Sequence, residues 1–234
     1  MSSAPGRPQA NSHRSAQHEG TPVCTTRIIV IAKAPLPGFA KTRLIPALGA
    51  HGAARLARRM LDHALGTALA AAIGPVELCA APDPGDPCWR DVAVPGEVAW
   101  SAQGAGDLGA RMARAAQGAC TRGEQVLLMG TDCPALSTTD LRDAARALDQ
   151  HHASLLPTFD GGYALLGLRH FHTSLFDNMP WSTSSVAAET VRRATQAGWD
   201  VKLLAPQHDI DEPADLRWLP PAWLAALEAA QHVA

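Results

Sequence analysis

The sequence lacks any apolar run long enough to span a bilayer, since the longest candidate, residues 64–73, is short and contains Gly66. It also lacks an apolar segment near its N-terminus, so we expect neither a secretory signal nor membrane association. Neither sign of charge is in excess: the formal net charge is −2 and the pI is about 6.5. This balance gives no global electrostatic reason to expect a nucleic-acid partner.

Signals for paired cysteines are missing as well. No two cysteines form a C-x-x-C pair and their number is odd, which excludes a zinc-site spacing and a disulfide framework. A reducing cytoplasm is therefore the expected compartment. The cysteines are Cys24, Cys79, Cys88, Cys120 and Cys133.

What the sequence does contain is enough apolar material for one core, because 47% of its 234 residues are hydrophobic. Residues 1–25 are rich in Ser, Pro, Gly, Gln and His and hold few aliphatic side chains. They cannot bury enough surface to offset the entropy of ordering, so we expect a disordered tail. A single domain is expected at residues 26–234.

Strand and helix patterns alternate along this domain. Apolar runs predict strands, and amphipathic periodicity predicts helices between them. Such alternation is typical of the α/β class, here a three-layer αβα domain with a mostly parallel sheet. The predicted strands are 27–32, 76–80, 98–100, 125–130, 153–156, 163–168 and 201–204. The predicted helices are 50–72, 107–119, 137–150, 184–196 and a last one that begins at about Pro221.

The loop after the first strand combines cations with turn residues. Lys33, Lys41 and Arg43 could neutralise a polyphosphate, with Arg43 binding in a bidentate manner. Gly38 and two prolines would shape the loop. Ligands of open α/β sheets bind beyond the carboxyl ends of the strands, where this loop lies. The alternative is a solvated basic loop, and it is not a P-loop, because the second glycine does not directly precede the Lys-Thr pair.

A second loop, residues 104–109, matches G-x-G-x-x-G, follows a predicted strand and opens a helix. With Asp132 roughly 20 residues later, it could be a dinucleotide-binding fingerprint. Two features oppose that interpretation. The motif lies mid-chain, and Asp107 places a carboxylate where a pyrophosphate would lie.

Acidic residues follow two later segments. Asp132 ends the predicted strand 125–130, and a buried carboxylate there would need a partner such as a metal bound to phosphate. In an extended chain Asp209 and Asp211 point to the same side, so both could face one cation. Three carboxylates suit Mg²⁺ or Mn²⁺. The alternatives are a turn or capping role for Asp132 and helix N-capping by Asp211.

Paired glycines mark a turn after Asp160. Asp160 could bind an acceptor hydroxyl or act as a base, whereas Gly161 and Gly162 imply close backbone approach to a ligand. A plain hairpin turn is the equal alternative. Cys133 is expected to be a small packed residue rather than a nucleophile, because no activating base is evident.

Taken together, these motifs resemble a bacterial family of glycosyltransferase-A-like proteins, some of which are labelled arsenosugar-biosynthesis glycosyltransferases. A more distant similarity is to the 2-phospholactate guanylyltransferases. The resemblance covers about residues 27–219. The motifs that carry it are Lys33-Ala-Pro-x-Pro-Gly-x-x-Lys-Thr-Arg-Leu44, Gln103-Gly-x-Gly-Asp-Leu-Gly109, Gly130-Thr-Asp-Cys-Pro134, Asp160-Gly-Gly-Tyr163, Trp181-Ser-Thr183 and Asp209-Ile-Asp211.

The resemblance implies a nucleotide-diphospho-sugar transferase fold. It also implies that Asp132, Asp209 and Asp211 bind the metal, while Lys41, Arg43 and Asp160 join Asp132 in catalysis. The nucleotide would lie between the first loop and the glycine loop. The implied nucleotide-binding residues are Lys33, Gly38, Lys41, Thr42, Arg43, Gln103, Gly104, Gly106, Asp107, Leu108 and Gly109.

Two reactions suit such a site. The first is nucleotidyl transfer from a nucleoside triphosphate to a small phosphorylated or carboxylated acceptor, and the second is glycosyl transfer from a nucleotide sugar. Three cations in one loop suit a triphosphate better than a diphosphate, so the sequence favours nucleotidyl transfer. A nucleotide-binding protein without catalysis and an NAD(P)-dependent oxidoreductase are further alternatives.

Overall fold

The computed structural model describes residues 25–231, of which residues 228–231 are described by their backbone alone. The predicted tail lies outside this range except for Thr25, so the domain limits stay a prediction. Each predicted strand and helix is present. The strands are β1 (Thr26–Lys33), β2 (Val76–Ala81), β3 (Ala99–Ala102), β4 (Gln125–Met129), β5 (Ala153–Pro157), β6 (Tyr163–Leu168) and β7 (Val201–Leu203). The helices are α1 (Ile45–Ala71), α2 (Leu108–Thr121), α3 (Thr138–Ala147), α4 (Val186–Gln196) and α5 (Pro221–Gln231).

The strands form one seven-stranded sheet in the order β3-β2-β1-β4-β6-β5-β7. All neighbouring pairs are parallel except the two made by β6, which runs antiparallel to β4 and β5. β1 lies inside the sheet between β2 and β4, and Ile28, Ile29 and Val30 are fully buried, as a strand covered on both faces requires. The predicted α/β class with a mostly parallel sheet is therefore confirmed.

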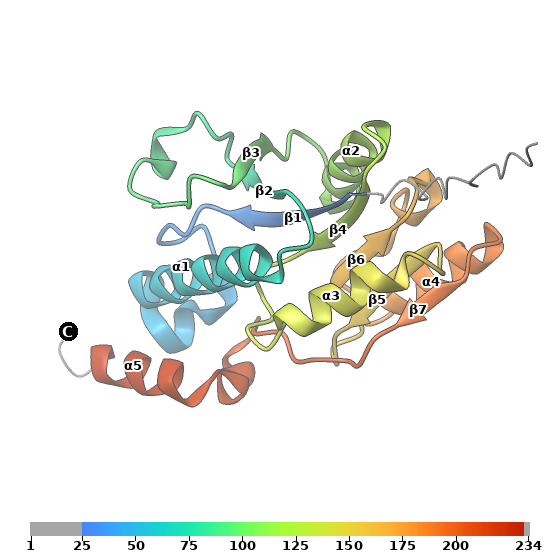
Figure 1. Cartoon of the computed structure of the whole chain (residues 1–234). Coiled ribbons are helices and arrows are strands. Elements are labelled where there is room, and N and C mark those ends of the chain that lie inside the picture. The colour runs from blue at the N-terminus through green and yellow to red at the C-terminus, as the bar shows by residue number, and fades with distance from the viewer. Residues whose placement is uncertain (1–24, 232–234) are drawn as a thin grey trace, which may run out of the picture.

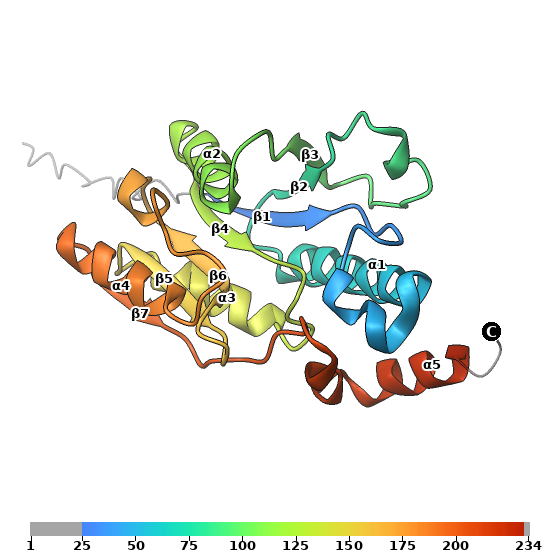
Figure 2. The ribbon, with the colours of Figure 1, turned by 180° about the vertical axis from the view of Figure 1, so that it is seen from behind.

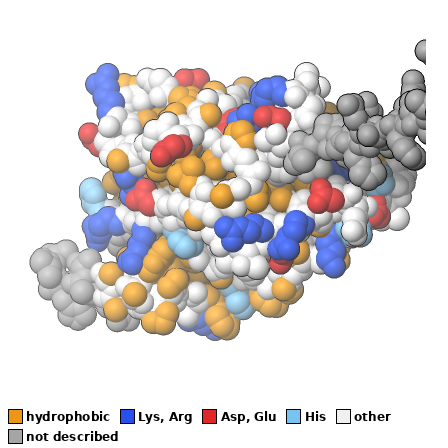
Figure 3. All heavy atoms as spheres, viewed as in Figure 1, with side chains coloured by type: hydrophobic (Ala, Val, Ile, Leu, Met, Phe, Trp, Pro, Cys, Tyr) orange, Lys and Arg blue, Asp and Glu red, His pale blue; other side chains and the backbone are white. Residues whose placement is uncertain are grey.

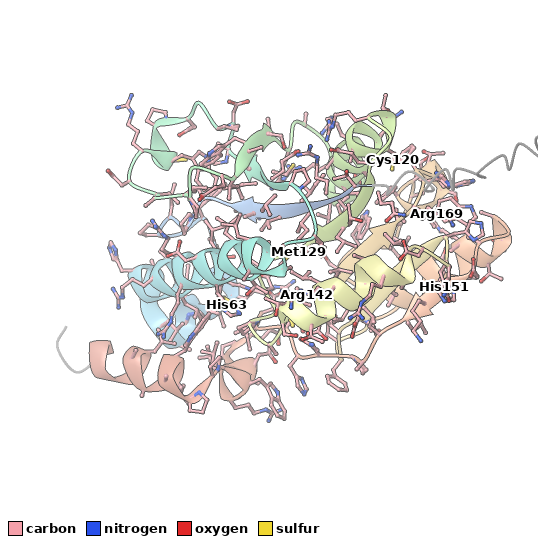
Figure 4. The ribbon with its side chains drawn as sticks, viewed as in Figure 1. His63, Cys120, Met129, Arg142, His151 and Arg169 are labelled. Carbon is pink, nitrogen blue, oxygen red and sulfur yellow. The ribbon has the colours of Figure 1, made fainter. Side chains whose placement is uncertain are left out.

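Helices cover both faces of the sheet. α1 and α3 lie side by side on one face (Figure 1), and α2 and α4 lie on the other (Figure 2). Arg142 of α3 reaches the end of α1 (Figure 4), where its guanidinium donates to the carbonyls of Ala70 and Ala71 at 2.9 and 3.0 Å. α5 packs beside α1, where the Trp223 ring meets the His63 ring edge-on.

The outer face of α1 and α3 carries a row of basic side chains (Figure 3). On these helices Arg58 pairs with Asp62 at 2.8 Å, and Arg142 is engaged as described above. These two cations are therefore held by acceptors of the protein itself.

None of the helices within residues 25–231 has the length and apolar character needed to cross a membrane.

Helix starts follow local capping chemistry. Ser137 and Asp140 form the capping box that the sequence predicts for α3. α1 starts at Ile45, five residues earlier than predicted, but Gly49 has the non-helical angles φ 67° and ψ 165°, so the regular helix does begin near residue 50. The alternative in which Asp211 caps a helix is wrong, because Glu212 takes the N-cap position of the following short turn.

Candidate functional site

The candidate site lies beyond the carboxyl ends of β1 and β4. Met129, the last residue of β4, lies in the middle of the molecule (Figure 4), and Asp132 follows three residues later. The backbone N–H of Ile210 donates to the carbonyl of Asp132 at 2.8 Å, which fixes the late acidic segment beside this loop. Ile210 is fully buried, while Asp209 and Asp211 on either side of it face the cavities. The alternation that the sequence predicts is therefore present.

Lys41 lies at the centre of the site. Its side chain is only 6% exposed, and its Nζ is 2.7 Å from Asp132 Oδ1 and 3.5 Å from Asp211 Oδ1. Nζ also donates to the carbonyl of Ile210 at 2.5 Å. Arg43 is 60% exposed and its Nη1 is 2.7 Å from Asp211 Oδ2. The structure thus brings the basic loop and two of the three predicted metal ligands into direct contact.

The largest of the cavities here has a volume of about 510 Å³ and opens between the basic loop and the glycine loop. Several predicted nucleotide-binding residues line it, whereas Gly38, Gly104 and Gly109 do not. Cations and carboxylates are mixed along its wall, so its charge is less positive than the loop sequence alone indicates. The charged residues are Lys33, Lys41, Arg43, Arg111, Asp107, Asp132 and Asp211, and the other predicted residues that line it are Thr42, Gln103, Gly106 and Leu108.

The glycine loop is organised by hydrogen bonds inside the protein. The amide of Gln103 donates to the carbonyls of Ala32 and Cys79 at 2.9 and 3.0 Å, which ties the loop to the ends of β1 and β2. Asp107 caps α2 by accepting from the N–H of Ala110 at 2.8 Å. A carboxylate therefore occupies the helix N-terminus that would receive a pyrophosphate in a dinucleotide fold, which disfavours that alternative.

Gly109 has a packing function. A Cβ added there would lie 2.5 Å from the carbonyl oxygen of Phe176 and 2.7 Å from Nε1 of Trp181. No side chain fits in this space, so the last glycine of the motif is needed for the indole to lie against α2. The residues of the glycine motif thus have different functions: Gly109 allows packing, Asp107 caps α2, and Gly106 lines the first cavity.

A second cavity, of about 430 Å³, adjoins the first. Both are lined by Arg43, Asp132 and Asp211. Asp160 lines the second cavity and also a third, smaller one of about 140 Å³, which Asp209 lines too. The predicted catalytic and metal residues therefore lie around one connected region.

Asp209 lies among other carboxylates, which disfavour its charged form. Burial first, and then the nearby carboxylates of Asp160, Asp211 and Asp132, raise its pKa to about 6. Oxygen donors under mutual repulsion are chemically suited to a hard divalent cation. Within residues 25–231, however, no three acidic, His or Cys side chains are close enough to form a complete ligand set.

Cys133 is a packed residue, as predicted. It is buried, and its thiol donates to Oε1 of Gln207 at 3.1 Å. Burial raises the pKa of the thiol to about 11, so the thiolate is scarce at neutral pH.

The sequence interpretation missed Arg111 and gave no function to Trp181. Arg111, on the first turn of α2, donates to the carbonyl of Gly106 at 2.9 Å and lines the first cavity. Its position four residues after the capping Asp107 is the only sequence signal that could have indicated it. Trp181 lines the second cavity from a loop before α4, and it was noted only as part of the family resemblance.

Comparison with known proteins agrees with this architecture. A family model for uncharacterised proteins conserved in bacteria, DUF2064, matches residues 61–183, more than half of the chain. The chain belongs to the DUF2064 family. A solved structure from Desulfovibrio desulfuricans G20, a candidate nucleotide-diphospho-sugar transferase, is 32% identical to this DUF2064 protein, with a TM-score of 0.78. The match covers 85% of this chain and 87% of the other.

Two nucleotidyltransferase structures share the fold of this DUF2064 protein at low identity. The 4-diphosphocytidyl-2C-methyl-D-erythritol synthase from Anaerococcus prevotii is 12% identical, with a TM-score of 0.55, over 86% of this chain and 99% of that one. CMP:2-keto-3-deoxy-manno-octonic acid synthetase with CTP is 13% identical, with a TM-score of 0.53, over 88% and 99%. No protein of curated function matches the sequence. The predicted nucleotide-diphospho-sugar transferase fold is confirmed.

Proposed function

We propose that this protein is a metal-dependent transferase that moves a glycosyl group from a nucleotide sugar to a small acceptor. One observation carries the proposal: Asp132, at the carboxyl end of β4, lines the first, second and third cavities. A donor phosphate in the first cavity and an acceptor in the second would therefore meet beside the same carboxylate. The transferase unit would be residues 26–234.

The first cavity supplies the donor subsite in this proposal. Lys33 and Arg111 would attract the diphosphate, together with Lys41 and Arg43. Asp132 and Asp211 would hold Mg²⁺ or Mn²⁺ with the phosphates completing the coordination, and Asp209 would support them. When bound, the metal would supply charge stabilisation for the departing diphosphate.

Glycosyl transfer is preferred to nucleotidyl transfer for a physical reason. The sequence interpretation favoured a triphosphate because of three cations in one loop, but three carboxylates line the same cavity as these cations, so its wall offers phosphates less net positive charge. The relative that is 32% identical is itself a candidate nucleotide-diphospho-sugar transferase. Nucleotidyl transfer is the second candidate, because four cations still line the first cavity and a triphosphate would use them.

The proposed chemistry forms a bond from an acceptor oxygen to the anomeric carbon of the sugar. The bond from that carbon to the diphosphate oxygen breaks, and the electron pair leaves with the nucleoside diphosphate. The acceptor proton would pass to Asp160, whose Oδ1 accepts from Thr158 Oγ1 at 2.5 Å and from the N–H of Gly162 at 2.9 Å. These two bonds would fix the carboxylate in position as a general base.

The test is calorimetric titration of nucleoside diphosphates, nucleotide sugars and nucleoside triphosphates in the presence of Mn²⁺ or Mg²⁺. Tight binding should require metal and should be lost in Asp132→Asn, while Asp149→Asn should behave like the wild type. Asp149 is an exposed carboxylate that forms no side-chain hydrogen bond or ion pair with another described residue. Release of nucleoside diphosphate from a bound nucleotide sugar would support glycosyl transfer, and inorganic diphosphate release from a triphosphate would support the second candidate. Metal-independent binding that survives Asp132→Asn would refute both.

A further inference from the structure

The wall of the second cavity differs in chemistry from that of the first. Rings and aliphatic side chains form much of it, including Trp181, Tyr163 and Met112. Ser182, Thr183 and Ser184 add hydroxyl groups from the loop before α4. We infer that this cavity takes an uncharged, hydroxyl-bearing acceptor that lays an apolar face against the Trp181 ring. The inference rests on the proposed function, because it names the acceptor class for the same site.

Charge argues against a phosphorylated or carboxylated acceptor. In the described part of the chain, the only cation that lines the second cavity is Arg43. Its Nη1 is 2.7 Å from Asp211 in this structure, and in the proposed donor complex it would face the donor phosphates. Three carboxylates line the same cavity: Asp132, Asp160 and Asp211. A metal held by Asp132 would have its charge met by the donor phosphates. An anionic acceptor would therefore face carboxylates and phosphates with no free counter-charge.

The Trp181 ring is fixed in place before any acceptor binds. Its edge packs against Gly109, where no side chain fits, and its plane meets the Tyr163 ring edge-on at 71° with 6.4 Å between the ring centroids. Tyr163 is partly buried, and the loss of solvent around its phenol raises the pKa of that group and keeps it neutral. A rigid indole presents a flat apolar surface, to which the C–H face of a sugar or polyol ring can pack.

The loop that carries Trp181 is held at both ends. Before it, Arg193 of α4 donates to the carbonyls of Ser174 and Asn178 at 2.9 and 3.0 Å. After it, the backbone of Ser184 packs so tightly on Gly161 that a Cβ at residue 161 would lie 2.0 Å from the Ser184 oxygen. The loop is therefore a preformed wall and not a segment that must order on binding.

The hydroxyls of this loop divide into two kinds. Thr183 Oγ1 donates to the carbonyl of Pro180 at 2.7 Å, so it serves the loop itself. The hydroxyls of Ser182 and Ser184 make no hydrogen bond with any other described residue, and both residues line the cavity. Two available hydroxyls can each donate to and accept from a hydroxyl of the acceptor, which suits a neutral polyol.

The test compares matched neutral and phosphorylated acceptors. Saturation-transfer NMR would measure binding of methyl glucoside against glucose 6-phosphate, and of glycerol against glycerol 3-phosphate. The wild-type protein would first be saturated with diamagnetic Mg²⁺ and a nucleoside diphosphate identified by the titrations above. We expect the neutral member of each pair to bind at least tenfold more tightly. Equal or tighter binding of the phosphorylated member, or no binding of either class to the nucleotide-saturated protein, would overturn the inference.

Variants of Trp181 separate this inference from the proposed function. Trp181→Ala should lower the affinity for neutral acceptors at least tenfold and leave the affinity for nucleoside diphosphate unchanged. Trp181→Phe should retain acceptor binding. Trp218→Ala is the matched control, because Trp218 is 44% exposed and does not line the cavities described here. Unchanged acceptor binding in Trp181→Ala would refute the stacking surface while donor binding stands. Loss of nucleotide binding in the wild type would instead refute the proposed function.

Discussion

Asp209→Asn should stabilise this protein at neutral and alkaline pH, although it removes a residue of the candidate site. The pKa of Asp209 is raised from 3.8 to about 6, by burial first and by Asp160 and its other acidic neighbours next. A raised carboxyl pKa means that the folded state favours the protonated form. The wild type therefore loses stability as the pH rises from the unfolded pKa, near 4, to the folded pKa, near 6. Above pH 6 the charged Asp209 carboxylate destabilises the folded state by the full amount, and the neutral side chain of Asn removes this destabilisation.

The size of the effect follows from the shift. A rise of two units is worth about 3 kcal/mol when the charge is fully shielded from solvent. Asp209 is only partly buried, so solvent screening reduces the expected gain to about 1–2 kcal/mol. For a chain of this length that gain corresponds to an increase in Tm of about 2–8 °C.

The assay is thermal unfolding of both proteins between pH 4 and pH 8.5 in the presence of a chelator. The two should unfold at similar temperatures near pH 4 and diverge through pH 4–6. In a parallel series without chelator, added Mn²⁺ should stabilise the wild type more than Asp209→Asn, because the cation offsets the same repulsion. Asp149→Asn, the same exchange at an exposed site, should show no such divergence. Equal Tm values for Asp209→Asn and the wild type at pH 8 would refute the crowding of carboxylates.

Three further outcomes are expected. Mn²⁺ should raise nucleoside diphosphate affinity by tenfold or more, and Lys41→Met should abolish most of this coupling. Calorimetric titrations with and without metal measure it, and an equal effect of Mn²⁺ on the wild type and Lys41→Met would show that the ion pairs do not matter. Gly161→Ala should cost about 2–4 kcal/mol in urea unfolding, because φ is +93° and the new Cβ would meet Ser184; the exposed Gly66 in α1, substituted by Ala, should cost nothing. Cys133 should resist iodoacetamide at pH 7.5 in the folded protein and react after unfolding, and rapid labelling of the native thiol would contradict its burial.

Much of the fold was predictable from local patterns. Continuous apolar runs identified the strands, and the spacing of Ser137 and Asp140 gave the start of α3. The positions of Asp209 and Asp211 on one side of the chain followed from the two-residue period around Ile210. These features depend on neighbours in sequence, which is why the sequence contains them.

The contacts that define the site were not predictable in the same way. Lys41 meets Asp132 and Asp211 across a separation of more than 90 residues, and only the fold brings them together. The glycine motif matched a nucleotide fingerprint, yet Gly109 is there to admit Trp181. The same sequence signal can thus arise from a ligand or from a packed ring, and only three-dimensional neighbours separate the two causes.

The pairing of Lys41 and Arg43 with acidic residues gives the site two ways to balance its charge. Without a metal, the two cations compensate Asp132 and Asp211, which would otherwise repel each other and Asp209. A divalent cation on those carboxylates would take over this function and release both basic side chains. The freed ammonium and guanidinium would then face the donor phosphates in the first cavity. Metal binding and phosphate binding would therefore be linked, because Lys41 and Arg43 exchange carboxylate partners for phosphate partners. The carboxylate cluster lowers the stability of the free protein, but it would be maintained because it makes that exchange possible.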